Sequence, residues 1–440
     1  MMDFAFILLN IFSYGKVPAN SCRNNPLKNK RNRSKVTHSI LACVLWNSEE
    51  VQLKRSVSVF LFALVTTALL SPPVPAAAFH EGGVGYCEGC HTLHPSPSGD
   101  GNGLPLLKRT DPSSTCLGCH AETSSLYNVL SSDGSSFTAG GDFYWLETAY
   151  AWTEEGDEKV SAGHKHGHNI VAVDYGLDED SVLRAAPGGD YPSAALSCIS
   201  CHDPHGKISD GENPAPISGS GSYGGDATGG AVLGNYRLLG GIGYAGGTTG
   251  GALFSNGAPV AVAPLPHNGP ESDSNHVAYG SGMSEWCANC HADLLPAGGA
   301  GDGTKHPAGN SAKMTSNIAD SYNAYVKSGD LTGVQTSAYL ALVPFEVGTV
   351  DVTLLDPESQ AGPEADANVM CLSCHRAHAS AFADAGRWDF QATLLADSHP
   401  ASSDTGASAG DVLNSYYGRD TASEFGPFQR QLCAKCHPCD

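Results

Sequence analysis

Six copies of one five-residue pattern, C-x-x-C-H, recur along this chain of 440 residues. Two thiols separated by two residues on a tight turn can reach the two vinyl groups of one porphyrin. The histidine that follows can then ligate the iron, so the pattern is the attachment signal of c-type haem. The six copies are Cys87, Cys90 and His91; Cys116, Cys119 and His120; Cys198, Cys201 and His202; Cys287, Cys290 and His291; Cys371, Cys374 and His375; and Cys433, Cys436 and His437.

Other uses of paired cysteines fit this pattern poorly. A thioredoxin-like redox site needs one C-x-x-C, and it does not need the histidine. Zinc ribbons pair such motifs without a trailing histidine at each. A disulfide scaffold would not give every cysteine pair the same spacing. The sequence therefore predicts six covalently attached haem c groups, with the six motif histidines as proximal ligands.

The remaining histidines outnumber the methionines that could serve as sixth ligands. Beyond residue 78 there are eleven further histidines, but the methionines are only Met283, Met314 and Met370. Paired imidazoles can therefore complete all six irons, and His/Met pairs cannot. Bis-histidine haems have lower potentials than His/Met haems. The neighbouring His164, His166 and His168 could form a loop metal site, supply one haem ligand, or lie in a solvated loop.

Three motifs extend to C-x-x-C-H-x-x-H, which adds His94, His205 and His378. Three residues past the first histidine, the second lies on the same side of a helical turn. It cannot reach the far face of its own haem, but it can reach the iron of an adjacent one. This extension predicts closely packed haems.

Residues 51–78 are expected to be a secretory signal peptide. Lys54 and Arg55 precede the apolar run 56–70, and small residues follow as far as Ala78. This order of charged, apolar and small residues is typical of an export signal, and the run is too short for a comfortable membrane span. Residues 1–50 are interpreted either as an upstream gene-model artefact or as a leader. We expect no membrane span in the mature chain.

Charge and composition limit the mature chain further. Removal of residues 1–78 leaves 15 basic and 42 acidic side chains, a net charge of −27, which argues against nucleic-acid binding. The 52 glycines and 26 prolines disfavour long regular elements. We expect residues 79–440 to be a single hexahaem domain with a multihaem cytochrome c fold. It would be mostly loops and turns with short helices and little strand, around a core built from six stacked haems. Helices are expected over 283–294, 311–328 and 408–418, and an irregular loop over 210–270.

Longer stretches around the motifs carry a family resemblance. They are residues 79–94, 167–171, 198–206, 236–241, 282–291, 306–310, 331–333, 371–380 and 416–419. From residue 79 onward the chain resembles the OmcS-type family of outer-surface hexahaem c-type cytochromes of metal-reducing bacteria, which polymerise into extracellular conductive filaments.

The resemblance implies a set of distal ligands. By position they fall on His80, His94, His168, His205, His306 and His378, which leaves His164, His166, His267, His276 and His399 as non-ligands. It also implies that His94 completes the iron of the haem held by Cys371, Cys374 and His375 in the adjacent subunit. Such a head-to-tail contact makes a homopolymer.

The expected function is extracellular electron transfer along a secreted cytochrome filament, with no catalytic residues. Expected partners are other extracellular cytochromes, partner cells, metal oxides and electrodes. Two alternatives remain: a monomeric periplasmic or outer-surface electron shuttle, and a multihaem oxyanion reductase, which would need a five-coordinate haem. Cys439, outside the six motifs, is either an exposed free thiol or part of an intermolecular disulfide.

Overall fold

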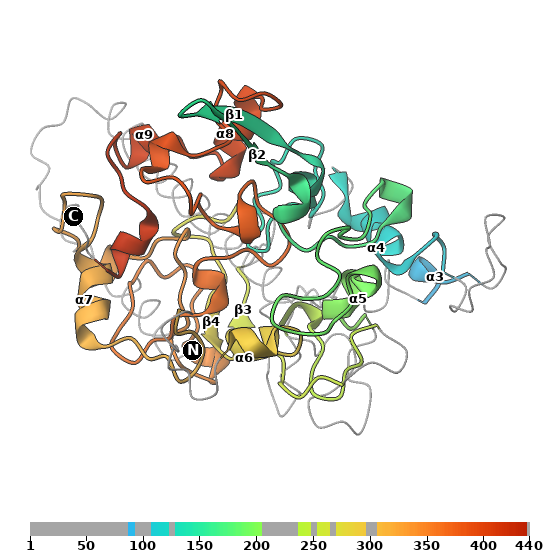
Figure 1. Ribbon diagram of the computed structural model, residues 1–440. Helices are drawn as coiled ribbons and strands as arrows, with labels where there is room; N and C mark the ends of the chain where they lie inside the picture. The colour runs from blue at the N-terminus through green and yellow to red at the C-terminus, as the bar shows by residue number, and fades with distance from the viewer. Residues whose placement is uncertain are drawn as a thin grey trace, which may run out of the picture. The chain divides into compact units, whose positions relative to one another are not determined.

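The computed structural model describes residues 87–92, 107–122, 128–204, 236–247, 253–264, 270–295 and 306–437, all within the unit Ala76–Asp440 (Figure 1). The expectations for the signal peptide and the residues before it lie outside these residues. So do those for His80, His94, His205, His267 and Cys439, and for the side chain of Cys87.

Short helices and turns dominate the described chain, as the sequence predicts. The α-helices are α3 (Cys87–Cys90), α4 (Pro112–His120), α5 (Cys198–Cys201), α6 (Met283–Cys287), α7 (Ser316–Ala324), α8 (Ala409–Ser415) and α9 (Thr421–Glu424). Single turns of 3-10 helix lie at Phe143–Glu147, Gly163–Lys165, Val173–Tyr175, Ser193–Ala195, Tyr236–Leu238, Ala292–Leu294, Gln335–Ser337, Val352–Leu354, Cys371–Ser373, Ala383–Ala385, Leu395–Asp397 and Leu432–Lys435.

Strand structure in the described residues is confined to two antiparallel ribbons. β1 (Tyr150–Glu154) pairs with β2 (Asp157–Ser161). Their two connecting residues, Glu155 and Gly156, both have positive φ (53° and 90°), as a tight hairpin turn of this length requires. β3 (Val260–Val262) pairs with β4 (Ala278–Ser281).

Some expected helices are shorter in the structure, and one expected loop contains a strand. Helix 283–294 is split, because α6 ends at Cys287 and a separate turn follows at Ala292–Leu294. Of the expected helix 311–328, only α7 (Ser316–Ala324) is helical. Met314 N–H donates to the Ala367 carbonyl (2.7 Å), so the residues before α7 pair with the chain around Ala367 and do not form a helix. Helix 408–418 corresponds to α8, with Ser408 as its N-cap. The expected loop 210–270 contains β3.

Buried side chains form two hydrophobic clusters. The larger includes Trp145, Tyr322, Leu342 and Trp388, each at most 1% exposed. The smaller includes Met283, Met370 and Leu372, which lie beside the fourth and fifth C-x-x-C-H turns. Side chains thus provide a scaffold against which the attachment turns pack.

Candidate haem sites

The described attachment motifs lie on short helices or at their ends: the second closes α4, and the fourth begins at the last residue of α6. In four of them the N–H of the motif histidine donates to the carbonyl of the first cysteine, at 3.0 Å in each case: His202 to Cys198, His291 to Cys287, His375 to Cys371, and His437 to Cys433. This repeated bond closes the five-residue turn. It brings two thiols and one imidazole together, as attachment and ligation of one haem require.

Three pairs of histidine rings lie close together, with their ring planes inclined to each other by 52° to 68°. Their ring centroids are 6.0 Å apart for His168 and His291, 6.4 Å for His202 and His378, and 6.0 Å for His306 and His437. Two metal–imidazole bonds of about 2 Å each, with about 1.1 Å from each nitrogen to its ring centre, would separate such rings by about 6 Å. The separation of each pair therefore fits one iron between the two imidazoles. Each pair joins one motif histidine to one histidine outside the motif turns.

Backbone carbonyls fix the orientation of these rings. An Nδ1–H that donates to a carbonyl leaves Nε2 unprotonated for a metal, which is the usual arrangement of ligating histidines. The carbonyl acceptors are Ala377 for His168 (2.8 Å), Arg237 for His202 (2.8 Å), Pro187 for His291 (2.8 Å), Pro307 for His306 (2.8 Å) and Asp384 for His375 (2.7 Å).

Histidines that the resemblance excludes as ligands have different surroundings. His166 donates from Nδ1 to the Trp145 carbonyl (2.8 Å), while its Nε2 accepts from the Ser161 hydroxyl (2.7 Å). Burial lowers the pKa of His166 to about 4. Both nitrogens of His276 face backbone carbonyls, at 3.0 and 2.9 Å. His399 stacks on Trp152 at 3.8 Å and contacts Asp404.

Two of the non-motif histidines are anchored on neighbouring backbone segments. His378 N–H donates to the Gly140 carbonyl (2.7 Å), and its own carbonyl accepts from His168 N–H (2.9 Å). Gly167 and Ala379 form an antiparallel bridge beside them. Residues 139–142, 166–168 and 377–380 therefore form one small hydrogen-bonded ladder that positions His168 and His378 together.

Successive motifs are neighbours in space. The Cys116 and Cys198 thiols lie close enough for each to shift the pKa of the other, raising that of Cys116 and lowering that of Cys198. Cys287 and Cys371 are neighbours in the same way, and Cys287 lowers the pKa of Cys371 to about 7. Burial raises the pKa of Cys201 to about 12, and the nearby Cys290 adds to the effect. Burial also raises the pKa of Cys374 to about 12, and the nearby Cys433 and Cys436 add to the effect. From the second motif to the sixth, each motif thus lies near the next.

The junction between the second and third motifs and that between the fourth and fifth share a serine contact. Ser113, three residues before Cys116, accepts a hydrogen bond from Cys198 N–H at 3.1 Å. Ser284, three residues before Cys287, accepts one from Cys371 N–H at 3.0 Å. Both serines have 0% exposure. The same contact therefore docks the third motif on the second and the fifth on the fourth.

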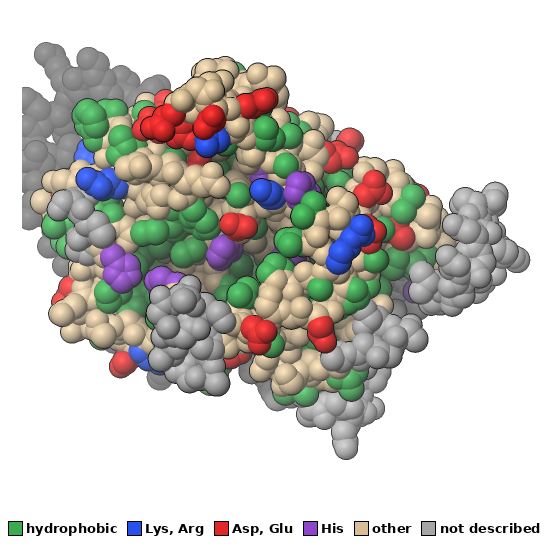
Figure 2. Space-filling model, in the orientation of Figure 1, with side chains coloured by type: hydrophobic (Ala, Val, Ile, Leu, Met, Phe, Trp, Pro, Cys, Tyr) green, Lys and Arg blue, Asp and Glu red, His purple; other side chains and the backbone are tan. Residues whose placement is uncertain are grey.

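Figure 2 shows histidine side chains along a hollow in this face of the molecule, among hydrophobic side chains. Met283, Met314 and Met370 are all buried in the hydrophobic clusters.

Within the described ranges, no group of three or more His, Cys, Asp or Glu side chains could hold a metal ion. No helix there is long and apolar enough to cross a membrane.

Comparison with known proteins identifies the family. No protein-family model matches the chain. Over 436 residues the chain is 43% identical to the C-type cytochrome OmcS of Geobacter sulfurreducens, covering 88% of this chain and all of the relative. This chain belongs to the OmcS family of c-type cytochromes.

Solved structures of OmcS agree with this family assignment. The OmcS nanowires of G. sulfurreducens, seen by cryo-electron microscopy, match with a TM-score of 0.72 and 43% identity, over 82% of this chain and all of the other. An outer membrane cytochrome S filament of the same organism matches with a TM-score of 0.70 over the same shares. These matches confirm the predicted cytochrome fold. As a c-type cytochrome of the OmcS family, the chain carries covalently bound haem c.

Sequence reasoning missed one group of residues at these sites. Glu271, Arg376 and Arg387 form a buried ionic cluster beside the fifth attachment turn. The only sequence signal was the position of two arginines shortly after Cys374, in a chain with few basic residues.

Proposed function

We propose that this protein conducts electrons outside the cell as a head-to-tail filament of cytochrome subunits. The observation that carries the proposal is the set of three histidine pairs with ring centroids 6.0 to 6.4 Å apart, because two imidazoles on one iron leave no position open for a substrate. Membership of the OmcS family supports the same function, since the matching solved structures are nanowires and filaments. When bound, the haems would supply one-electron redox chemistry.

The proposed haem complement is six, one at each motif, with the twelve motif cysteines as attachment points and the six motif histidines as proximal ligands. Ring geometry supports His168 as distal ligand to the haem of Cys287 and Cys290. It likewise supports His378 for the haem of Cys198 and Cys201, and His306 for that of Cys433 and Cys436. We assign His80 and His205 to the first two haems without choosing between them.

The haem of Cys371 and Cys374 is proposed to take its distal ligand from another subunit. His375 has its Nδ1 anchored on the Asp384 carbonyl, so its Nε2 is oriented as a ligand. We propose that His94 of the adjacent subunit supplies the opposite imidazole. A contact between two different surfaces of the same chain continues into a filament unless it closes a ring.

The remaining assignments follow from this function. Residues 79–440 are proposed to be a single hexahaem domain, released by cleavage of the signal peptide 51–78. Electrons would pass to other extracellular cytochromes, partner cells, metal oxides or electrodes. With every iron six-coordinate, the protein would act as an electron carrier and not as an enzyme.

Substitution of His94 by alanine tests the proposal, with His378→Ala as the matched control. Both variants should keep six haems by pyridine haemochrome assay and show one high-spin haem by paramagnetic resonance. Only His94→Ala should lose filaments in negative-stain microscopy. All-low-spin filaments in His94→Ala would contradict inter-subunit ligation.

Wild-type material distinguishes the alternatives. A discrete particle by size-exclusion chromatography would favour the shuttle. A high-spin haem in wild-type filaments would favour the reductase.

A further inference from the structure

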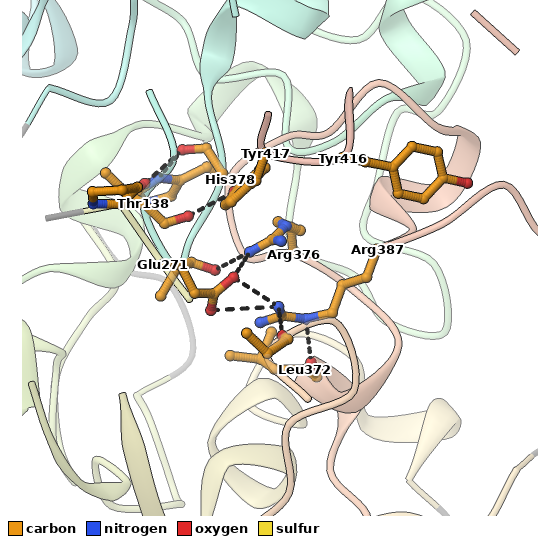
Figure 3. Close-up of polar contacts among 12 residues, drawn as sticks. Thr138, Glu271, Leu372, Arg376, His378, Arg387, Tyr416 and Tyr417 are labelled. Carbon is orange, nitrogen blue, oxygen red and sulfur yellow. Dashed lines mark hydrogen bonds and ion pairs between the residues drawn. The ribbon is translucent and has the colours of Figure 1, made fainter. Parts of the chain in front are cut away.

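A buried ionic cluster lies against the fifth attachment turn. Glu271 accepts from Arg376 Nη1 at 2.6 Å and from Arg387 Nη1 at 3.2 Å, as Figure 3 shows. All three side chains are at most 3% exposed. Burial alone would raise the pKa of Glu271, but Arg376 and then Arg387 hold it below its ordinary value. The cluster therefore contains two cations and one anion.

Arg387 contacts the attachment turn directly. Its Nε–H donates to the carbonyls of Leu372 (2.7 Å) and His375 (3.2 Å), and its backbone N–H donates to the Cys374 carbonyl (2.7 Å). The guanidinium of Arg387 is thus hydrogen-bonded to the backbone of the fifth attachment turn, at Leu372 between the two cysteines and at the proximal His375.

Arg376 supplies the second positive charge of the cluster. It follows His375 in sequence, and its guanidinium lies over the Tyr417 ring at 3.7 Å. Its Nη1 also donates to the Ala139 carbonyl at 3.2 Å. Neither arginine can move into solvent without breaking these contacts.

We propose that the net positive charge of this cluster, formed by Glu271, Arg376 and Arg387, raises the reduction potential of the haem held by Cys371 and Cys374. The inference rests on the proposed function, which places a haem there and makes it the junction between subunits.

The physical reason is the change of charge on reduction. An iron that gains an electron loses one positive charge, so a nearby fixed cation disfavours the oxidised form. Charges act most strongly where water is excluded, because the effective dielectric constant there is low. Fixed charges and burial are among the means by which a protein sets a haem potential.

Another buried acid lies near this site. Glu346 accepts hydrogen bonds from Met283 N–H at 2.7 Å and from Asn368 Nδ2–H at 3.1 Å, at the start of the helix that leads to Cys287. Burial raises the pKa of Glu346, which favours its neutral form. The substitutions described below leave Glu346 unchanged, so its charge does not alter the direction of either shift.

Two substitutions with opposite charge changes test the proposal. Arg387→Gln removes the net positive charge, and Glu271→Gln increases it. In spectroelectrochemical titration, one sixth of the haem absorbance change should shift to lower potential in Arg387→Gln and to higher potential in Glu271→Gln. We expect the reduction equilibrium of that haem to change by about tenfold, which is about 59 mV for one electron.

The direction of the shift in reduction potential distinguishes an electrostatic role of the cluster from a merely structural one. Both substitutions remove the ion pair between Arg387 and Glu271, so a merely structural role of that pair predicts shifts in the same direction. The double variant should return close to the wild-type potential. If Arg387→Gln does not fold, Arg376→Gln takes its place and should also lower the reduction potential of this haem. Arg184→Gln, which removes an arginine that is 66% exposed from a surface pair, should shift nothing.

The haem count keeps the two proposals distinguishable. Fewer than six haems in the wild type by pyridine haemochrome assay would contradict the proposed haem complement. Six haems with no shift, or with shifts of one sign, would overturn the electrostatic inference and leave the filament proposal standing.

Discussion

At the scale of single residues, hydrogen bonding distinguishes candidate ligands from other histidines. His168 and His166 are two residues apart, yet they differ in their partners. His168 has only Nδ1 tied to a carbonyl, and its ring faces His291 across 6.0 Å. His166 has both nitrogens bonded within the protein. One short segment therefore holds a candidate ligand beside a histidine that stabilises the fold.

Substitution within this segment should separate the two roles. His168→Ala should keep six haems but convert one to high spin, because the haem of Cys287 and Cys290 loses its distal imidazole. His164→Ala is the matched control, since its ring faces no other histidine in the described structure, and it should remain all low spin. Absorption and paramagnetic resonance spectra measure the difference. A low-spin His168→Ala variant would contradict this ligand assignment.

The sequence indicates which types of residue form the candidate sites, but it says little about their arrangement. The C-x-x-C-H spacing named every motif cysteine and proximal histidine, because attachment chemistry acts over five residues. It did not pair His378 with His202, since residues 176 positions apart meet only through tertiary contacts. The Glu271 cluster was missed for the same reason: Glu271 lies 105 residues from Arg376.

At the scale of elements, short segments replace long helices because the chain must return repeatedly to the haem sites. The ladder of residues 139–142, 166–168 and 377–380 is an example, in which three loop segments share backbone hydrogen bonds. Composition predicted short elements correctly. It did not predict this ladder, because pairing between distant loops leaves no periodic pattern in the sequence.

Glycine is required where this ladder passes the His378 ring. A Cβ at Gly140 would lie 2.9 Å from His378 Nδ1, closer than carbon and nitrogen normally approach. Gly140→Ala should therefore displace that imidazole or the segment, destabilise the protein by about 1–3 kcal/mol, and raise the high-spin fraction of one haem. Denaturation midpoints and paramagnetic resonance measure both effects. Gly257→Ala is the control, because its nearest neighbour would be 3.9 Å away; equal effects of the two substitutions would refute the steric argument.

At the scale of the whole molecule, motifs that follow one another in sequence, from the second to the sixth, are also neighbours in space. Cys116 lies beside Cys198, Cys201 near Cys290, Cys287 beside Cys371, and Cys374 near Cys433. Haems attached at these turns would form a continuous series. A series within one subunit conducts over long distances only if subunits join end to end, so the proposed contact between His94 and the fifth haem completes the path.

The two ends of such a contact are chemically different, and this predicts how a defective subunit acts in a mixture. A His94→Ala chain can still accept His94 from a wild-type neighbour, but it cannot donate one, so it should stop growth at one end. Co-expression with one variant chain in ten should limit filaments to a mean length of about ten subunits, measured by electron microscopy. His378→Ala at the same fraction should leave the length unchanged, because its missing ligand lies within the subunit. Wild-type lengths with His94→Ala, or loss of all filaments at this small fraction, would argue against a one-directional chain of ligand donation.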